Sequence, residues 1–106
     1  MSVKHVTSKS ELDKIFSASK GSLIVLDFYA SWCGPCHLVA PQFSKMAKKY
    51  TDVVFIKIDV DEAEDLAELY DVKVMPTFHF IKDDVTITVL EGNCVEEIKK
   101  NIEMHK

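Results

Sequence analysis

The sequence predicts an α/β fold in which strands and helices alternate and a β-hairpin precedes the last helix. Three apolar, β-rich stretches are separated by helical patterns in the first two thirds of the chain. That alternation favours parallel strands joined by right-handed crossovers. Two further β-rich stretches are separated only by a short polar connection, which is typical of an antiparallel hairpin. The predicted element order is therefore β-α-β-α-β-α-β-β-α.

Length and composition favour a single domain over residues 1–106 and exclude several classes of function. A chain of 106 residues supports one core, and it has neither repeats nor linkers. The net charge of -4, without a run of lysines, argues against a nucleic-acid partner. No segment has membrane-spanning length and the N-terminus has no apolar signal core, so no membrane partner is expected. Because three cysteines are too few for a secreted disulfide framework, we expect a cytoplasmic protein, and a nuclear pool is also compatible.

The N-terminal part is predicted to form an edge strand, a helix and a central strand. Residues 3–6 are short and partly apolar, as in an edge strand. Ser8 and Glu11 form a capping box, in which the hydroxyl accepts from a first-turn amide and the carboxylate reaches back. Residues 23–29 are apolar on both faces, which indicates a central strand covered by helices on each side, and Asp27 is the one charge inside it. The first helix is expected to bury Leu12, Ile15 and Phe16.

The rest of the chain continues this alternation. The segment after Cys36 has one apolar helical stripe, and residues 53–58 form the next expected strand, which contains Lys57. Asp61 is the expected cap of a third helix. The inward side chains of these two helices are expected to be Val39, Phe43, Met46, Ala47 and Tyr50, and then Ala63, Leu66, Ala67 and Tyr70.

The C-terminal third is predicted to form the hairpin and the last helix. Residues 77–81 and 86–90 are the two strands, and residues 82–85 connect them. Asn93 opens the last helix, which is expected to turn Val95, Ile98 and Ile102 inward.

Residues 32–36, Trp-Cys-Gly-Pro-Cys, carry the clearest chemical signal. Two cysteines separated by two residues, placed where an apolar strand ends and a helix begins, predict a redox site. The alternative is half of a zinc site, but zinc needs two further ligands and no second Cys-x-x-Cys or His-x-x-x-His occurs. Cys94, His79 and His5 could complete such a site only through an accidental geometry, so no metal is expected.

The two cysteines are expected to differ in thiol–disulfide exchange. Cys33 should precede a helix that begins near Gly34, where unpaired amides and the helix dipole stabilise a thiolate. Pro35 suits the first helical turn, because its missing N–H costs nothing there. Cys36 follows one turn later inside the helix, where burial disfavours its thiolate. Cys33 is thus the expected attacking thiol and Cys36 the resolving thiol.

With this motif in this element order, the chain resembles thioredoxins over nearly its whole length. The resemblance implies the thioredoxin fold, a mixed five-stranded β-sheet sandwiched by four α-helices. It implies a monomeric protein-disulfide reductase of disulfide-containing target proteins, active in electron transport and cell redox homeostasis, with no bound cofactor. Electrons would come from NADPH through thioredoxin reductase, since the chain has no nucleotide fingerprint of its own. A disulfide oxidant or isomerase, or a non-catalytic binding module of the same fold, is the alternative.

Asp27 and Lys57 are further candidates for the site. A carboxylate in an apolar central strand is costly when it is ionised and unpaired, so it is usually neutral or paired. The resemblance implies that Asp27 accepts the proton of Cys36 during resolution and that Lys57, on an adjacent strand, tunes Asp27. The alternatives are a structural aspartate satisfied by local donors and a lysine that snorkels from a strand face.

The resemblance also implies a ring of substrate-facing residues, with a cis peptide bond before its proline. Taken alone, residues 75–76 would be a loop proline ahead of a strand, and a tryptophan is more often partly buried packing. The ring consists of Trp32, Met75, Pro76, Gly92 and Asn93. Gly34 and Pro35 complete the motif between the cysteines.

A few positions depart from the thioredoxin pattern or stay open. His37 stands where lysine or arginine is usual, either as a solvated helix residue or as a pH-dependent charge near the cysteines. Asp83 and Asp84 occupy the hairpin turn in place of glycine, and Asn93 is also a candidate helix cap. Cys94 is either a small apolar residue at the start of the last helix or an exposed third thiol.

Overall fold

The computed structural model describes residues 2–106. Met1, which belongs to the N-terminal stretch that has no apolar signal core, lies outside the described residues. Within that range the chain forms five strands and four helices in the predicted order. Their bounds are β1 Val3–His5, α1 Lys9–Ala18, β2 Ile24–Tyr29, α2 Gly34–Lys49, β3 Val54–Asp59, α3 Glu64–Leu69, β4 Thr77–Lys82, β5 Val85–Glu91 and α4 Val95–His105.

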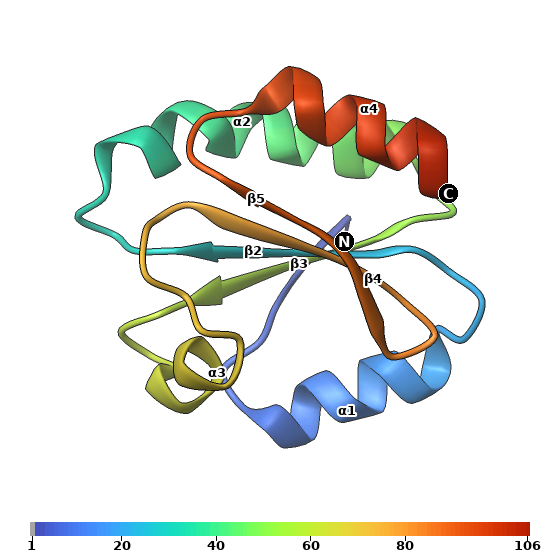
Figure 1. The fold of residues 1–106 in the computed structure, drawn as a ribbon, viewed down its shortest axis with the longest axis horizontal. Helices are drawn as coiled ribbons and strands as arrows, with labels where there is room; N and C mark the ends of the chain where they lie inside the picture. The colour runs from blue at the N-terminus through green and yellow to red at the C-terminus, as the bar shows by residue number, and fades with distance from the viewer. Residues whose placement is uncertain (1) are drawn as a thin grey trace.

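The strands form one mixed sheet with the order β1-β3-β2-β4-β5. β1, β3 and β2 run parallel to one another, whereas β4 pairs antiparallel with both β2 and β5. Helices α2 and α4 cover one face of the sheet, and α1 and α3 cover the other (Figure 1). This is the arrangement that the resemblance implied, with the predicted central strand, β2, in the middle.

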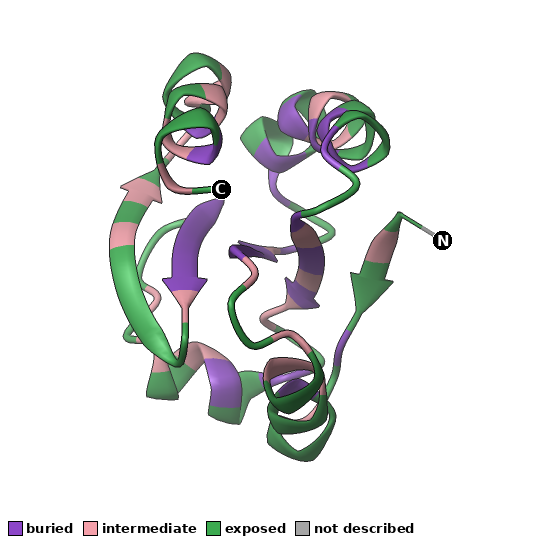
Figure 2. Ribbon diagram, turned by 90° about the vertical axis from the view of Figure 1, so that its right-hand side faces the viewer, coloured by how far each residue is buried: buried purple, intermediate pink, exposed green. Residues whose placement is uncertain are grey.

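The two faces of the sheet carry separate apolar cores because side chains alternate along each strand. Val25 packs on the α2 side with Phe43, while Leu26 packs on the opposite side with Leu12 and Leu66. The central strands and the inner faces of the helices are buried, and the edge strand β5 is largely exposed (Figure 2). Asp27 shares its face with Val25, so alternation turns its carboxylate toward the α2 layer.

The predicted capping box forms at the start of α1, but two other predicted caps are wrong. Ser8 Oγ accepts from the amide of Glu11 at 3.2 Å. Asp61, by contrast, lies within a turn, and α3 begins only at Glu64, after Ala63. The Asp61 carboxylate instead accepts a hydrogen bond from the indole of Trp32. Asn93 lies one position too early to cap α4, since Cys94 precedes its first residue.

The hairpin turn is tighter than predicted, because β4 extends to Lys82 and β5 begins at Val85. Its two central residues, Asp83 and Asp84, have φ values of 51° and 66°, and a type I′ turn requires positive φ at both positions. Asp83 Oδ1 accepts from the amide of Gly21 at 2.8 Å, and an exposed ion pair joins Asp84 to Lys20 at 3.3 Å. These contacts with the α1–β2 loop help to offset the conformational free energy that the two aspartates cost in the left-handed region.

His79, in β4, is expected to make the protein less stable in acid. It is buried against the rings of Phe28 and Tyr70, and its Nδ1 has no partner among the described residues. Burial lowers the pKa of His79, and a backbone hydrogen bond with Tyr70 opposes this only in part. Because the unfolded chain then binds the proton more readily, the stability contributed by neutral His79 is lost as pH falls from about 6.5.

Replacing this histidine should remove that part of the acid sensitivity. We expect His79→Phe to lose less stability than the parent protein between about pH 6.5 and 5 in urea unfolding. His5→Gln, which changes an exposed histidine, is the control and should follow the parent. Parallel pH profiles for His79→Phe and the parent would contradict the assignment.

Candidate active site

The two cysteines lie where β2 leads into α2, at the left in Figure 1. Cys33 is the residue immediately before α2, Gly34 and Pro35 occupy its first turn, and Cys36 follows one turn later. The cysteines are joined as a disulfide, with their Cα atoms 5.3 Å apart. The amide of Cys36 donates to Cys33 Sγ at 3.2 Å, so the sulfur caps the helix. A helix N-terminus stabilises negative charge, which favours a thiolate on Cys33 in the reduced protein.

Cys36 is buried as expected, but burial does not distinguish the two cysteines, because Cys33 is buried as well. Cys33 is 5% exposed and Cys36 is 7% exposed, because both pack against Ala30 in a small cluster that Met75 and Val60 also contact. The difference between them is instead one of position along the helix. Only the sulfur of Cys33 accepts a hydrogen bond from a first-turn amide, a group that has no partner within the helix itself.

Asp27 is buried in β2, and its proton affinity is higher than that of an ordinary aspartate. It is 3% exposed, and its Oδ1 has no hydrogen-bond partner among the described residues. Burial raises the pKa of Asp27 to about 7, and the charge of Lys57 opposes this. The predicted alternative of an aspartate satisfied by local donors therefore lacks a donor to Oδ1. A carboxyl group with this pKa can exchange a proton near neutral pH.

Lys57 lies directly opposite Asp27 in the parallel pairing of β2 and β3. Its ammonium is 4.2 Å from the centroid of the Tyr29 ring. No ion pair between Lys57 and a carboxylate within 4.0 Å occurs in the described part of the chain. The structure thus places Lys57 on the strand adjacent to Asp27, as the resemblance implied, and puts its ammonium over the Tyr29 ring.

Trp32 is exposed and is held by a residue from a distant part of the chain. The indole is 67% exposed, and its Nε1 donates to Asp61 Oδ2 at 2.9 Å. The alternative of a tryptophan buried in packing is therefore wrong. Sequence reasoning assigned Asp61 to a helix cap, and no local pattern signals a contact between residues 29 positions apart.

The remaining ring residues converge on the cysteines from two other loops. The Met75–Pro76 peptide bond is cis, as the resemblance implied, and Met75 packs against Cys33 and Cys36. The amide of Gly92 donates to the carbonyl of Pro76 at 2.9 Å, which ties the β5–α4 loop to the loop before β4. Asn93 follows and is exposed. Met75 thus contacts the redox pair directly, and Gly92 is joined to the same loop through Pro76.

The structure also shows the surroundings of His37 and Cys94, for each of which the sequence allowed two interpretations. His37 is exposed, and its Nε2 lies 2.7 Å from the carbonyl oxygen of Ser31. The ring therefore contacts the loop before Cys33. Cys94 is half-buried against the α2-side core. Burial, and then the charge of Glu97, raise the pKa of its thiol. This favours the interpretation of Cys94 as a small packing residue.

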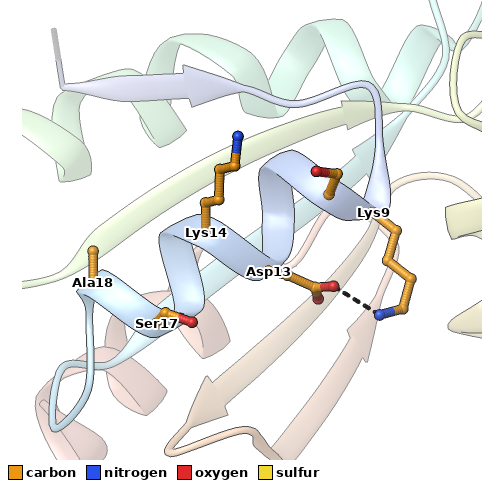
Figure 3. Close-up of a pocket in the computed structure, with 6 residues that line it drawn as sticks. Lys9, Asp13, Lys14, Ser17 and Ala18 are labelled. Atoms are coloured by element: carbon orange, nitrogen blue, oxygen red, sulfur yellow. Dashed lines mark hydrogen bonds and ion pairs between the residues drawn. The ribbon is translucent and has the colours of Figure 1, made fainter.

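Further features that bear on the site around the cysteine pair are a surface hollow, the grouping of possible metal ligands and the lengths of the helices. One surface hollow follows α1 (Figure 3), and none of its lining residues belongs to the predicted site: Lys9, Ser10, Asp13, Lys14, Ser17 and Ala18. Over residues 2–106, no three His, Cys, Asp or Glu side chains gather as a metal site would require. In the same range, every helix is too short or too polar to cross a membrane.

Comparison with known proteins identifies the family. A family model described as Thioredoxin matches residues 3–104. The chain belongs to the thioredoxin family. Thioredoxin of Ophiophagus hannah is 44% identical over 103 residues, which cover 97% of this chain and 98% of that protein. Thioredoxin-1 of Caenorhabditis elegans is 42% identical over 97 residues, covering 92% and 84%.

A solved structure agrees with this relationship. The X-ray structure of Fasciola hepatica thioredoxin is 40% identical, covers 97% of this chain and 99% of its own, and superposes with a TM-score of 0.95. The predicted thioredoxin fold is thereby confirmed. The protein is a thiol–disulfide oxidoreductase with protein-disulfide reductase activity, and Cys33 and Cys36 form its redox-active disulfide. Thioredoxins act on proteins that contain disulfides and need no bound cofactor.

The hydrogen bond between Trp32 and Asp61 should contribute to the binding of protein substrates. We expect Asp61→Ala to raise the apparent KM for a protein disulfide about fivefold with little change in kcat, because one such bond contributes about 1 kcal/mol. Asp61→Asn keeps a carbonyl acceptor and should remain close to the parent. Trp32 is the only tryptophan, so its emission reports on the indole directly. An unchanged KM in Asp61→Ala would rule out this contribution.

Proposed function

We propose that the two cysteines divide the reduction of a target disulfide into an attacking and a resolving step. Cys33 thiolate attacks one target sulfur and forms a mixed disulfide, and the other target sulfur leaves as a thiolate. Cys36 then attacks Cys33 Sγ and releases the second target thiol. Two electrons pass to the target, and Cys33 and Cys36 end as a disulfide. The observation that carries this assignment is the hydrogen bond from the Cys36 amide to Cys33 Sγ.

Asp27 is the proposed proton acceptor for Cys36 in the second step. Its carboxyl group faces the α2 layer, and its pKa of about 7 suits proton transfer at neutral pH. Lys57, opposite Asp27 in the sheet, is proposed to tune that proton affinity through its charge. Gly34 and Pro35 place Cys36 one helical turn beyond Cys33.

Target proteins are proposed to bind across the ring formed by Trp32, Met75, Pro76, Gly92 and Asn93. Support comes from the exposed indole and from the hydrogen bond between the Gly92 amide and the Pro76 carbonyl. An exposed aromatic side chain beside a methionine is suited to contact with varied apolar side chains.

We further propose that electrons reach the protein from NADPH through thioredoxin reductase, in electron transport that maintains cell redox balance. A cytoplasmic location, with a nuclear pool, and action as a monomeric single domain over residues 1–106 belong to the same proposal. Family membership supports this assignment.

A coupled assay tests the proposal. NADPH oxidation should require this protein, thioredoxin reductase and a protein disulfide together, and each omission should remove it. If dithiothreitol supports reduction of the target and thioredoxin reductase does not, the proposed electron donor is wrong while the reductase activity stands.

A further inference from the structure

Four side chains form a polar group on the face of the sheet that α2 covers. Asp27 and Tyr29 are two residues apart on β2 and so share a face. In the parallel register, Lys57 lies opposite Asp27 and Asp59 lies opposite Tyr29. An acidic group, a cation and an aromatic ring therefore meet at the end of β2 that leads to the cysteines.

The position of the ammonium within this group is specific. Lys57 Nζ is 4.2 Å from the centroid of the Tyr29 ring, whereas the two lysines over the Tyr50 ring lie at 5.1 and 5.2 Å. Among residues 2–106, Lys57 makes no carboxylate ion pair within 4.0 Å, and Asp27 Oδ1 is left without a hydrogen bond. A cation and an unpartnered buried acid in register with each other would be expected to pair. The Tyr29 ring competes with Asp27 for the positive charge of Lys57.

We propose that Tyr29 is a positioning residue that holds the ammonium of Lys57 on its ring and away from the carboxyl group of Asp27. Its effect is to keep the proton affinity of Asp27 high enough for exchange with a thiol. This inference rests on the proposed role of Asp27, but the placement of Lys57 can be tested without that role.

The other charged or titratable groups around the pair come from several elements. Asp59 lies on β3, and Glu62 follows β3. On β1, His5 pairs with Lys57 in register, while β4 presents the apolar Phe78 opposite Asp27. Cys36 belongs to α2, which covers this face. In the disulfide form, Cys33 and Cys36 have no thiol to titrate, and the Asp27 carboxyl signal is followed separately from those of Asp59 and Glu62.

Tyr29 raises the basicity of Asp27 by keeping the opposite charge at a distance. An ammonium that closed onto the carboxylate would favour its ionised form and lower the pKa of Asp27 toward that of an ordinary aspartate. The direction of the change is therefore fixed in advance. Loss of the ring should lower the proton affinity of Asp27, and loss of Lys57 should raise it.

The test is a direct titration of Asp27 in the disulfide form, by carboxyl ¹³C NMR. We expect Tyr29→Leu to lower the Asp27 midpoint by about one pH unit, a tenfold loss of proton affinity. Tyr29→Phe keeps the ring and should stay within about 0.2 pH unit of the parent, since the hydroxyl is not required. An unchanged or higher midpoint in Tyr29→Leu overturns the proposal.

A double-mutant cycle separates the effect of Lys57 from that of better hydration. In a Lys57→Met background, Tyr29→Leu should no longer lower the Asp27 midpoint. If the drop persists there, the ring acts by excluding water and the proposal is wrong. Should Tyr29→Leu fail to fold, trifluorophenylalanine at position 29 weakens the attraction while keeping the shape, and should give a smaller downward shift. The same replacement at Tyr50, which also carries lysines, is the control and should leave Asp27 unchanged.

The rate of resolution then tests the link to catalysis. With Asp27 as proton acceptor, the acid limb of the resolution rate should move to lower pH in Tyr29→Leu, together with the NMR midpoint. A shifted midpoint with an unmoved rate profile would retain the placement of Lys57 and refute the role of Asp27.

Discussion

Cys33→Ser is expected to abolish reduction of protein disulfides, with a loss of at least roughly 10³-fold in kcat/KM. The serine hydroxyl is not ionised at neutral pH, and the helix amide that contacts Cys33 Sγ would then have no thiolate to stabilise. The measurement is turnover of a protein disulfide with dithiothreitol as donor, so that the result does not depend on a reductase.

Cys36→Ser is expected to behave differently, and the contrast tests the two roles. Attack by Cys33 should proceed, but the mixed disulfide should persist because no second thiol resolves it. Non-reducing electrophoresis should reveal one adduct per protein molecule that dithiothreitol releases. Adducts formed by Cys33→Ser instead would reverse the roles.

Cys94→Ser is the matched control for both variants. The half-buried Cys94 thiol lies outside the redox pair, and burial raises its pKa. We therefore expect normal turnover in the Cys94→Ser single variant, and no loss of adducts in the Cys36→Ser, Cys94→Ser double variant. Loss of the adducts would mean that Cys94 had formed them.

Asp27→Asn is expected to slow resolution about a hundredfold at neutral pH, the lower end of the range of general base catalysis. Attack by Cys33 on the target should change much less. Single-turnover kinetics distinguish the two steps by following formation and decay of the mixed disulfide. Asp52→Asn, an exposed change, is the control for lost charge. An unchanged decay rate would remove Asp27 from the mechanism.

The same substitution should stabilise the fold above neutral pH. Since the pKa of Asp27 is raised from 3.8 to about 7, the folded protein binds this proton more tightly than the unfolded chain. The stability that protonated Asp27 contributes therefore falls as pH rises from about 4 to 7 and then levels off, a total of roughly 4 kcal/mol. Asp27→Asn should remove that slope in urea unfolding of the disulfide form. Its advantage over the parent should be largest near pH 8 and should vanish near pH 4.

The elements that sequence predicted well are those with strong local patterns. A continuous apolar run, which indicates burial on both faces, predicts the strand β2, and an apolar stripe at helical spacing predicts α2. The capping box at Ser8 is equally local and forms as predicted. The cysteine motif is local too, since the redox pair is only three residues apart.

Prediction failed where a local pattern met a stronger distant partner. Asp61 has a cap-like spacing, yet it accepts from the indole of Trp32 and α3 begins later. Asp83 and Asp84 of the hairpin turn adopt positive φ, and both contact the α1–β2 loop. In both cases the deciding energy came from residues that the local sequence does not bring together.

By itself, the sequence determined the alternation of strands and helices, the place of the cysteine motif at a strand–helix junction and the presence of a charge in each of two buried strands. These follow from side-chain periodicity and from spacing along one chain. Only the tertiary structure decided that the ammonium of Lys57 lies on the Tyr29 ring, that Trp32 is held by Asp61 and that the two cysteines are equally buried. The physical reason is that burial, dielectric and charge partners depend on which segments pack together, and those terms set the chemistry of this site.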